Sequence, residues 1–197
     1  MKKPMSFILV GLIACGCASY TASSLTALTP TPVKSMTSGS EFTVACKAYN
    51  SMDCKRYLDR NVLEMGYQPI QIYIKNDTNK TYTFSPDKLS IPLANVGTIA
   101  QKAHTNTEGR VTGYALGGLL LWPLWIAAVV EGLKSQEANA LLDSDFDAKV
   151  AKNVDLSPGQ SYNAIVFVKD SDYKSEFTAT LQEQNSNHFE VVPMVVR

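Results

Sequence analysis

The chain has 197 residues, with 18 basic residues, 18 acidic residues and four cysteines. A neutral chain whose lysines and arginines do not cluster lacks the charge that a nucleic-acid-binding face needs, so no nucleic-acid partner is predicted. The apolar content is that of a globular protein, and the length suits one domain with a substantial core.

The first residues are typical of a secretory signal. Lys2 and Lys3 precede the apolar stretch Met5–Ala14. That stretch is shorter than the roughly 20 residues that a membrane-spanning helix requires. A short apolar core behind lysines indicates a signal peptide, so we exclude it from the fold.

The end of this stretch reads Leu12-Ile13-Ala14-Cys15, which resembles the lipobox of bacterial lipoproteins. The resemblance implies that residues 1–14 are a signal peptide and that Cys15 carries a diacylglycerol and an acylated amino group. A second frame places the lipid on Cys17. An ordinary secretory signal or an uncleaved anchor helix is the remaining alternative.

The resemblance also implies a location. Each buried methylene of an acyl chain contributes about 0.8 kcal/mol, so two or three chains hold a protein firmly on a membrane. Gly16 follows Cys15 where an aspartate would imply retention in the inner membrane. The expectation is a lipid-anchored protein of the cell envelope, at the outer membrane and facing the periplasm.

The next segment is rich in serine, threonine and proline and has no apolar periodicity. Such a composition buries too little surface to offset the entropy of ordering the chain. We therefore predict that residues 15–40 form a lipid-anchored flexible tether. The alternative is an edge strand around Leu25–Val33, against which Pro30 and Pro32 argue.

From residue 41 to residue 197 the chain has the pattern of one β domain. Ile70, Ile72 and Ile74 alternate with polar or amphipathic residues, which predicts a half-buried strand. Short strands separated by turn residues continue to the end of the chain and favour an antiparallel β-sandwich. The layout resembles that of immunoglobulin-like domains of exported proteins, in pattern only.

The alternation stops over residues 94–153, where we predict an inserted apolar helical hairpin. Val111–Val130 contains no charged residue and has about the length of a membrane span. Pro123 near its middle argues against a span, and a span would also separate two halves that need one another to form sheets. The stretch could instead pack on the sandwich, or dip into a bilayer or contact another subunit, possibilities that the sequence leaves open. The residues predicted to make such a contact are Leu119, Leu120, Leu121, Trp122, Leu124, Trp125 and Ile126.

Cys46 and Cys54 lie eight positions apart in the predicted domain. Because an exported protein meets an oxidising compartment, we predict that they form a disulfide. A metal site would need more ligands than these two cysteines.

The sequence offers no recognisable catalytic set. No motif joins His104 or His188 to a nucleophile, and no glycine-rich loop could hold a phosphate. Asp143, Asp145 and Asp147 begin like a calcium loop, but the turn glycine and the bidentate glutamate are missing. The sequence therefore predicts no catalytic residue, no metal and no cofactor.

The favoured hypothesis is a non-catalytic envelope lipoprotein, in which a β-sandwich interaction module carries a hydrophobic helical contact surface. Its partners would be the membrane, through the N-terminal lipid, and a protein or a second copy, through residues 111–130. One alternative is a membrane-active or oligomerising accessory of a transport or secretion assembly. The second is a hydrolase with no recognisable motif.

Overall fold

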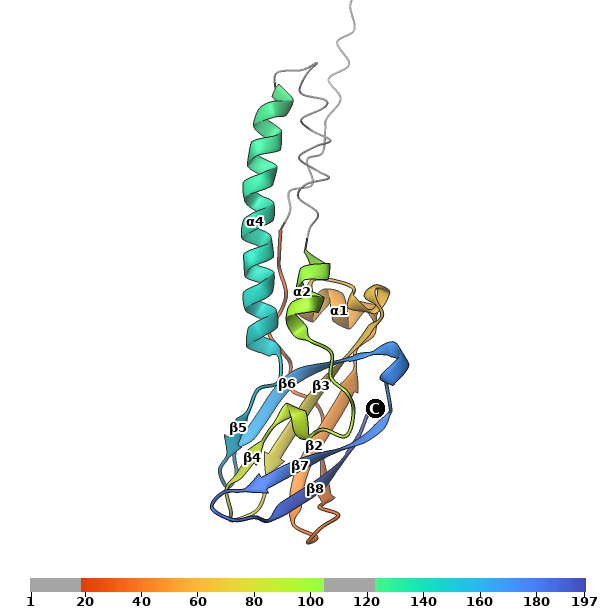
Figure 1. Cartoon of the computed structure of the whole chain (residues 1–197), viewed down its shortest axis with the longest axis vertical. Helices are drawn as coiled ribbons and strands as arrows, with labels where there is room; N and C mark the ends of the chain where they lie inside the picture. The colour runs from red at the N-terminus through yellow and green to blue at the C-terminus, as the bar shows by residue number, and fades with distance from the viewer. Residues whose placement is uncertain (1–18, 105–122) are drawn as a thin grey trace, which may run out of the picture. The chain divides into compact units, whose positions relative to one another are not determined.

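The computed structural model describes residues 19–104 and 123–197, and the side chains of residues 19–104 and 134–197 (Figure 1). The chain divides into two compact units. Residues Tyr20–Thr105 and Glu137–Arg197 form the unit that carries every described strand, and we call it the β unit. Met1–Ser19 and Asn106–Gln136 form the other unit.

The β unit contains two four-stranded sheets in which all neighbouring strands are antiparallel. The first sheet has the order β1 (Thr31–Lys34), β2 (Glu41–Ala48), β3 (Tyr67–Asn76) and β6 (Ser161–Lys169). The second sheet has the order β5 (Val154–Leu156), β4 (Tyr82–Phe84), β7 (Glu176–Glu183) and β8 (Phe189–Val195). The prediction of a mainly antiparallel β fold is confirmed.

The two sheets share one apolar core. Ile70, Ile72 and Ile74 of β3 are fully buried in it, as their alternation predicts, and they meet residues such as Leu181 and Met194 from the second sheet. Burial of these side chains is the main force that holds the sheets together.

The other face of the first sheet is also covered, by helices. These are α1 (Ser51–Leu58), α2 (Val96–Ala103) and the last turns of α4 (Pro123–Lys149). The described part of the chain also contains three short 3-10 helices, η1 (Val62–Met65), η2 (Pro86–Lys88) and η3 (Asp170–Asp172). Ile165 and Phe167 of β6 point into this second core, and the rings of Phe146 and Phe167 stack 5.8 Å apart. A strand buried on both faces is apolar at consecutive positions, which explains the run Ala164–Val168.

Helix α1 was not predicted, although the sequence contains its start signal. The Asn50 side chain accepts hydrogen bonds from the backbone N–H groups of Met52 and Asp53, both at 2.9 Å. The Asp53 carboxylate accepts one in return from the Asn50 N–H, which completes a capping box. This cap directs Cys54 and Leu58 into the second core.

Helices α2 and α4 lie within the range where the helical insertion is predicted. Helix α4 begins at Pro123, a residue favoured in the first turn because its missing N–H has no partner to lose there. Ala138, Leu142 and Phe146 are buried one and two turns apart, whereas Leu141 is 51% exposed. Among the described residues, no helix combines the length and the hydropathy that crossing a membrane would require.

The predicted tether is wrong for its second half. Thr31–Lys34 pair with β2 as an edge strand, in which Pro32 lies opposite Thr43. An edge strand tolerates proline because one side of its backbone has no ladder to complete. The residues before β1 are not free either, since the Gln71 side chain donates a hydrogen bond to the Thr26 carbonyl at 2.8 Å.

The strands run between two ends of the β unit. At the first, which we call the turn end, the turns after β3, β5 and β7 and the turn between β1 and β2 meet: the Gly159 N–H donates to the Asn76 carbonyl, and the Gln184 N–H donates to the Thr81 carbonyl. The other, which we call the helical end, is formed by α1, α2 and the last turns of α4 (Figure 1). Strands of eight to ten residues separate these ends by about 30 Å.

Candidate functional site

The helical end holds the first described residues of the chain in place. The Tyr20 hydroxyl donates a hydrogen bond to the Asp145 carboxylate of α4, and the Arg60 guanidinium lies 5.7 Å from the centre of the Tyr20 ring. The Ser23 N–H donates to the carbonyl of Arg56 at 2.7 Å. Burial, together with the negative charge of Asp145, raises the pKa of Tyr20, so its hydroxyl stays a donor.

Lys149 connects this segment to the helices. Its side chain is only 9% exposed, and its ammonium donates to the carbonyls of Ser23 at 2.8 Å and Tyr57 at 2.7 Å and to the Asp145 carboxylate at 2.6 Å. Three acceptors match the three donors of an ammonium, which offsets the cost of burying its charge. We call the contacts of Tyr20, Ser23, Asp145 and Lys149 the N-terminal clamp.

The same end contains the two points at which the chain leaves the β unit for residues 106–136 and returns from them. His104 ends α2, and its imidazole Nε2 lies 2.7 Å from the Asp143 carboxylate of α4. Asp143 and Asp145 are two positions apart, so the exits after residue 104 and before residue 137 lie beside the N-terminal clamp. The chain therefore leaves the β unit at one end in three places.

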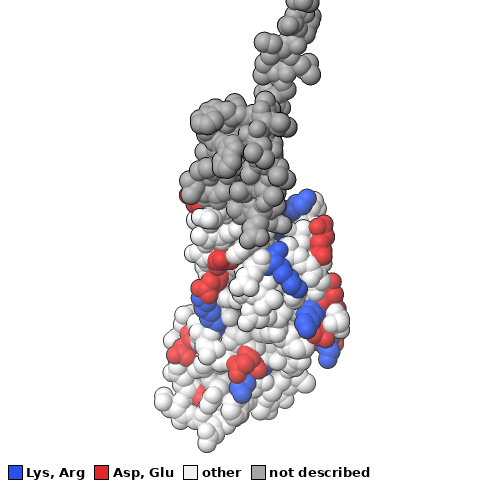
Figure 2. Space-filling view, turned by 45° about the horizontal axis from the view of Figure 1, so that its top comes forward, with Lys and Arg blue, Asp and Glu red and all other residues white. Residues whose placement is uncertain are grey.

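The charges on this surface are mixed. Figure 2 shows lysine and arginine side chains interspersed with acidic ones where the described residues are visible. Much of the interspersion is direct pairing, as between Arg60 and Asp59 at 2.8 Å. The part of the described surface visible in Figure 2 therefore shows no single-sign patch for binding a polyanion.

The three aspartates that begin like a calcium loop have other partners. Asp145 pairs with Lys149 one turn on. Asp143 contacts His104, and Asp147 pairs with Lys152 at 2.7 Å. All three lie near the C-terminal end of α4, where the helix dipole does not favour a negative charge. No group of three potential metal ligands occurs in the described part of the chain.

Most residues predicted to contact the membrane lie outside the described residues. These are Cys15, Cys17 and Leu119–Trp122. Leu124, Trp125 and Ile126 belong to α4, but their side chains are not among those described. Lipidation and hydrophobic contact therefore remain predictions.

The predicted disulfide is wrong. Cys46 and Cys54 are both buried free thiols. Cys46 points into the core between the sheets, whereas Cys54 points into the helical core on the other face of the first sheet. The sheet itself separates the two sulfur atoms, which sequence distance could not reveal.

We expect both thiols to be protected in the folded protein and available once it unfolds. Burial raises the pKa of Cys46 to about 12 and that of Cys54 to about 11, so little reactive thiolate forms at neutral pH. Mass spectrometry after treatment with iodoacetamide should show slow labelling of the native protein and complete labelling in denaturant without reductant. If labelling in denaturant required a reductant, Cys46 and Cys54 would be joined by a disulfide after all, and the structure would be wrong on this point.

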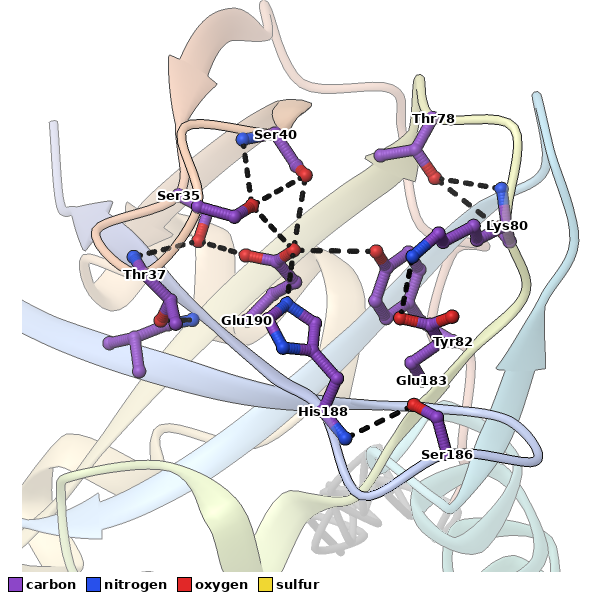
Figure 3. Close-up of polar contacts among 12 residues, drawn as sticks. Ser35, Thr37, Ser40, Thr78, Lys80, Tyr82, Glu183, Ser186, His188 and Glu190 are labelled. Atoms are coloured by element: carbon purple, nitrogen blue, oxygen red, sulfur yellow. Dashed lines mark hydrogen bonds and ion pairs between the residues drawn. The ribbon is translucent and has the colours of Figure 1, made fainter.

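A second polar cluster lies at the turn end, around a carboxylate that sequence reasoning missed (Figure 3). Glu190 of β8 is only 1% exposed. It accepts hydrogen bonds from the hydroxyls of Ser35, Ser38 at 2.7 Å and Ser40 at 3.0 Å, and His188 Nε2 lies 3.0 Å away. We call these five residues the Glu190 cluster. The sequence did contain a sign that Glu190 is buried. It lies two and four positions before Val192 and Met194, so it points to the same inner face of β8.

These contacts keep Glu190 ionised. Burial alone would raise the pKa of Glu190, but the hydrogen bonds from the three serines and His188 lower it to about 2. The cluster fastens the turn between β1 and β2 to β8, because the serines belong to that turn. Tyr82 of the second sheet adds a weaker contact at 3.4 Å.

The geometry of the Glu190 cluster is not that of a catalytic triad. A serine nucleophile needs a hydrogen bond to the base that removes its proton. Here the serine hydroxyls donate to Glu190, which is too weak a base to remove their protons because its pKa is lowered to about 2, and the imidazole of His188 contacts the same carboxylate. The arrangement positions a loop and does not activate a hydroxyl.

A groove of about 410 Å³ lies between the edges of the two sheets, along β1, β2 and β8. Its lining includes no histidine, aspartate or glutamate, the side chains that most often act as a general base. Its lining residues are Thr26, Ala27, Leu28, Thr29, Thr31, Val33, Val44, Ala45, Cys46, Lys47, Pro193, Val195 and Arg197.

Comparisons with known proteins give no relative: the chain matches no protein-family model, no curated protein and no solved structure.

Proposed function

We propose that the protein is a non-catalytic envelope lipoprotein, in which a lipid on Cys15, or on Cys17, holds the β unit at the outer membrane facing the periplasm. The observation that carries the proposal is the arrangement of the helical end. The N-terminal clamp, the exit after His104 and the exit before Glu137 lie together there. A lipid at the N-terminus and the uncharged stretch 111–130 would thus both begin from one end of the β unit.

The same arrangement favours contact of residues 111–130 with the bilayer or with a protein partner. An apolar stretch of that length needs an apolar environment. In the described residues, the core between the sheets is filled by strand side chains and the second core by α1, α2 and the last turns of α4. Because the stretch 111–130 needs such an apolar environment, we keep a membrane-active or oligomerising accessory of a transport or secretion assembly as the second candidate function.

The connectivity supports an immunoglobulin-like class for the sandwich, which we also propose. β2, β3 and β6 are neighbours in one sheet, and β4, β7 and β8 are neighbours in the other. Strands A, B and E and strands C, F and G of immunoglobulin domains have the same order along the chain. One departure is β5, which pairs with β4 and not with β6. An experimental structure tests this assignment.

Replacing Cys15 by serine should abolish lipid attachment and release the protein from membranes, because one residue carries the anchor. The measurement is the intact mass of the purified protein together with its distribution between membrane and soluble fractions. Replacing Cys17 by serine is the matched control and should change neither. The reverse result would assign the lipid to Cys17, and unmodified mass in every variant would contradict a lipoprotein.

A further inference from the structure

We propose that the helical end of the β unit faces the lipid headgroups at close range, while the turn end points away from the bilayer. The inference rests on the proposed lipid anchor. The flexible tether predicted from composition would let the domain move far from the membrane and turn freely. In the arrangement proposed here, the β unit stays close to the membrane with its helical end towards it.

The first step is the length of free chain between the lipid and the clamp. A fully extended chain spans at most about 3.5 Å per residue. Tyr20 is five positions after Cys15 and three after Cys17. The linker therefore reaches at most about 17 Å from Cys15, or about 10 Å from Cys17.

The second step is that Tyr20 is fixed to the β unit and cannot extend the linker. Its ring and hydroxyl contact Arg60 and Asp145, and the next residues bond to α1 through the backbone of Ser23 and the Thr21 N–H. Lys149 of α4 donates a further hydrogen bond to this segment, at the Ser23 carbonyl. Composition alone predicts that residues 20–40 are flexible. Because Tyr20 is already fixed to the β unit, these residues add no length to the free linker between the lipid and the β unit.

The third step is the direction that this imposes. The clamp lies at the helical end, about 30 Å from the turn end along the strands. The linker is shorter than the distance between the two ends of the β unit. It therefore holds the helical end near the headgroups and leaves the turn end farther from the bilayer. Acidic and basic side chains are mixed on the described surface visible in Figure 2, so the inference relies on the covalent anchor for the attraction to the membrane.

Energy transfer to labelled lipid headgroups tests this orientation. The full lipidated chain is placed in vesicles of phosphatidylethanolamine and phosphatidylglycerol that contain a small fraction of a headgroup-labelled acceptor lipid. One exposed position carries a donor dye in each variant, Gln101→Cys at the helical end or Asn79→Cys at the turn end. Cys46 and Cys54 are buried, and whichever of Cys15 and Cys17 is not lipidated is serine.

The expected result is transfer several-fold more efficient from position 101 than from position 79. A flexible insertion of about 20 residues between Ala18 and Ser19 should reduce transfer at position 101, because the domain can then leave the surface. Equal transfer from both positions, or no effect of the insertion, would overturn the orientation alone. Protein that lacks the lipid mass and leaves the vesicles would overturn the proposed function as well.

Discussion

Replacing Glu190 by glutamine should lower the free energy of unfolding by about 3 kcal/mol at neutral pH. A folded-state pKa near 2 against the ordinary value of 4.5 corresponds to that energy, at about 1.4 kcal/mol per pKa unit. Glutamine keeps the shape but has one acceptor oxygen where three serines and a histidine converge. Urea unfolding of the full chain in mild detergent, followed by circular dichroism, measures the change.

The pH dependence has a definite sign. Because the pKa of Glu190 is lower in the folded state, the unfolded chain binds the proton more readily. The stabilisation is therefore complete above about pH 4.5 and is lost as the pH falls towards 2. The wild-type protein should lose stability over that interval, and the Glu190→Gln variant should lose about 3 kcal/mol less.

Glu183→Gln is the matched control for this prediction. Glu183 lies on the neighbouring strand β7 and pairs with the more exposed Lys80 at 2.9 Å. Exposed pairs contribute little, so this variant should unfold almost as the wild-type protein does. An equal loss in both variants would mean that the Glu190 cluster has no special role.

Replacing Lys149 by methionine should destabilise the protein by about 3 kcal/mol and release the N-terminal segment. The change leaves the Asp145 carboxylate and the carbonyls of Ser23 and Tyr57 without their shared donor. Hydrogen exchange should show faster exchange at the Ser23 amide, and urea unfolding should show the lost stability.

Lys152→Met serves as the control, because Lys152 pairs with Asp147 on the exposed surface near the same helix end. It should change the free energy of unfolding by no more than about 0.5 kcal/mol. If Lys149→Met left the exchange of Ser23 unchanged, the N-terminal segment would be held by other contacts and the clamp would be assigned wrongly.

The sequence predicted the strands well where one face is apolar. Ile70, Ile72 and Ile74 lie on the inner face as expected, because a two-residue period has a direct structural meaning. These patterns are local, so one sequence is enough to recognise them.

Features that depend on distant partners could not be predicted. Composition suggested that residues 18–40 stay unfolded, but Lys149 and Gln71 supply hydrogen bonds from far along the chain. The spacing of Cys46 and Cys54 suggested a bond that the intervening sheet prevents. The burial of Glu190 could be predicted from its position in the alternation of β8, but its serine partners could not, because they lie in a turn about 150 positions earlier.

The contact between Lys149 and Ser23 joins residues 126 positions apart, which sets an order of events during synthesis. The chain is synthesised from its N-terminus, so the segment around Ser23 lacks its contact with Lys149 until residue 149 has been made. If Cys15 carries the proposed lipid, cleavage and acylation there could take place before residues 20–23 dock on the helical end.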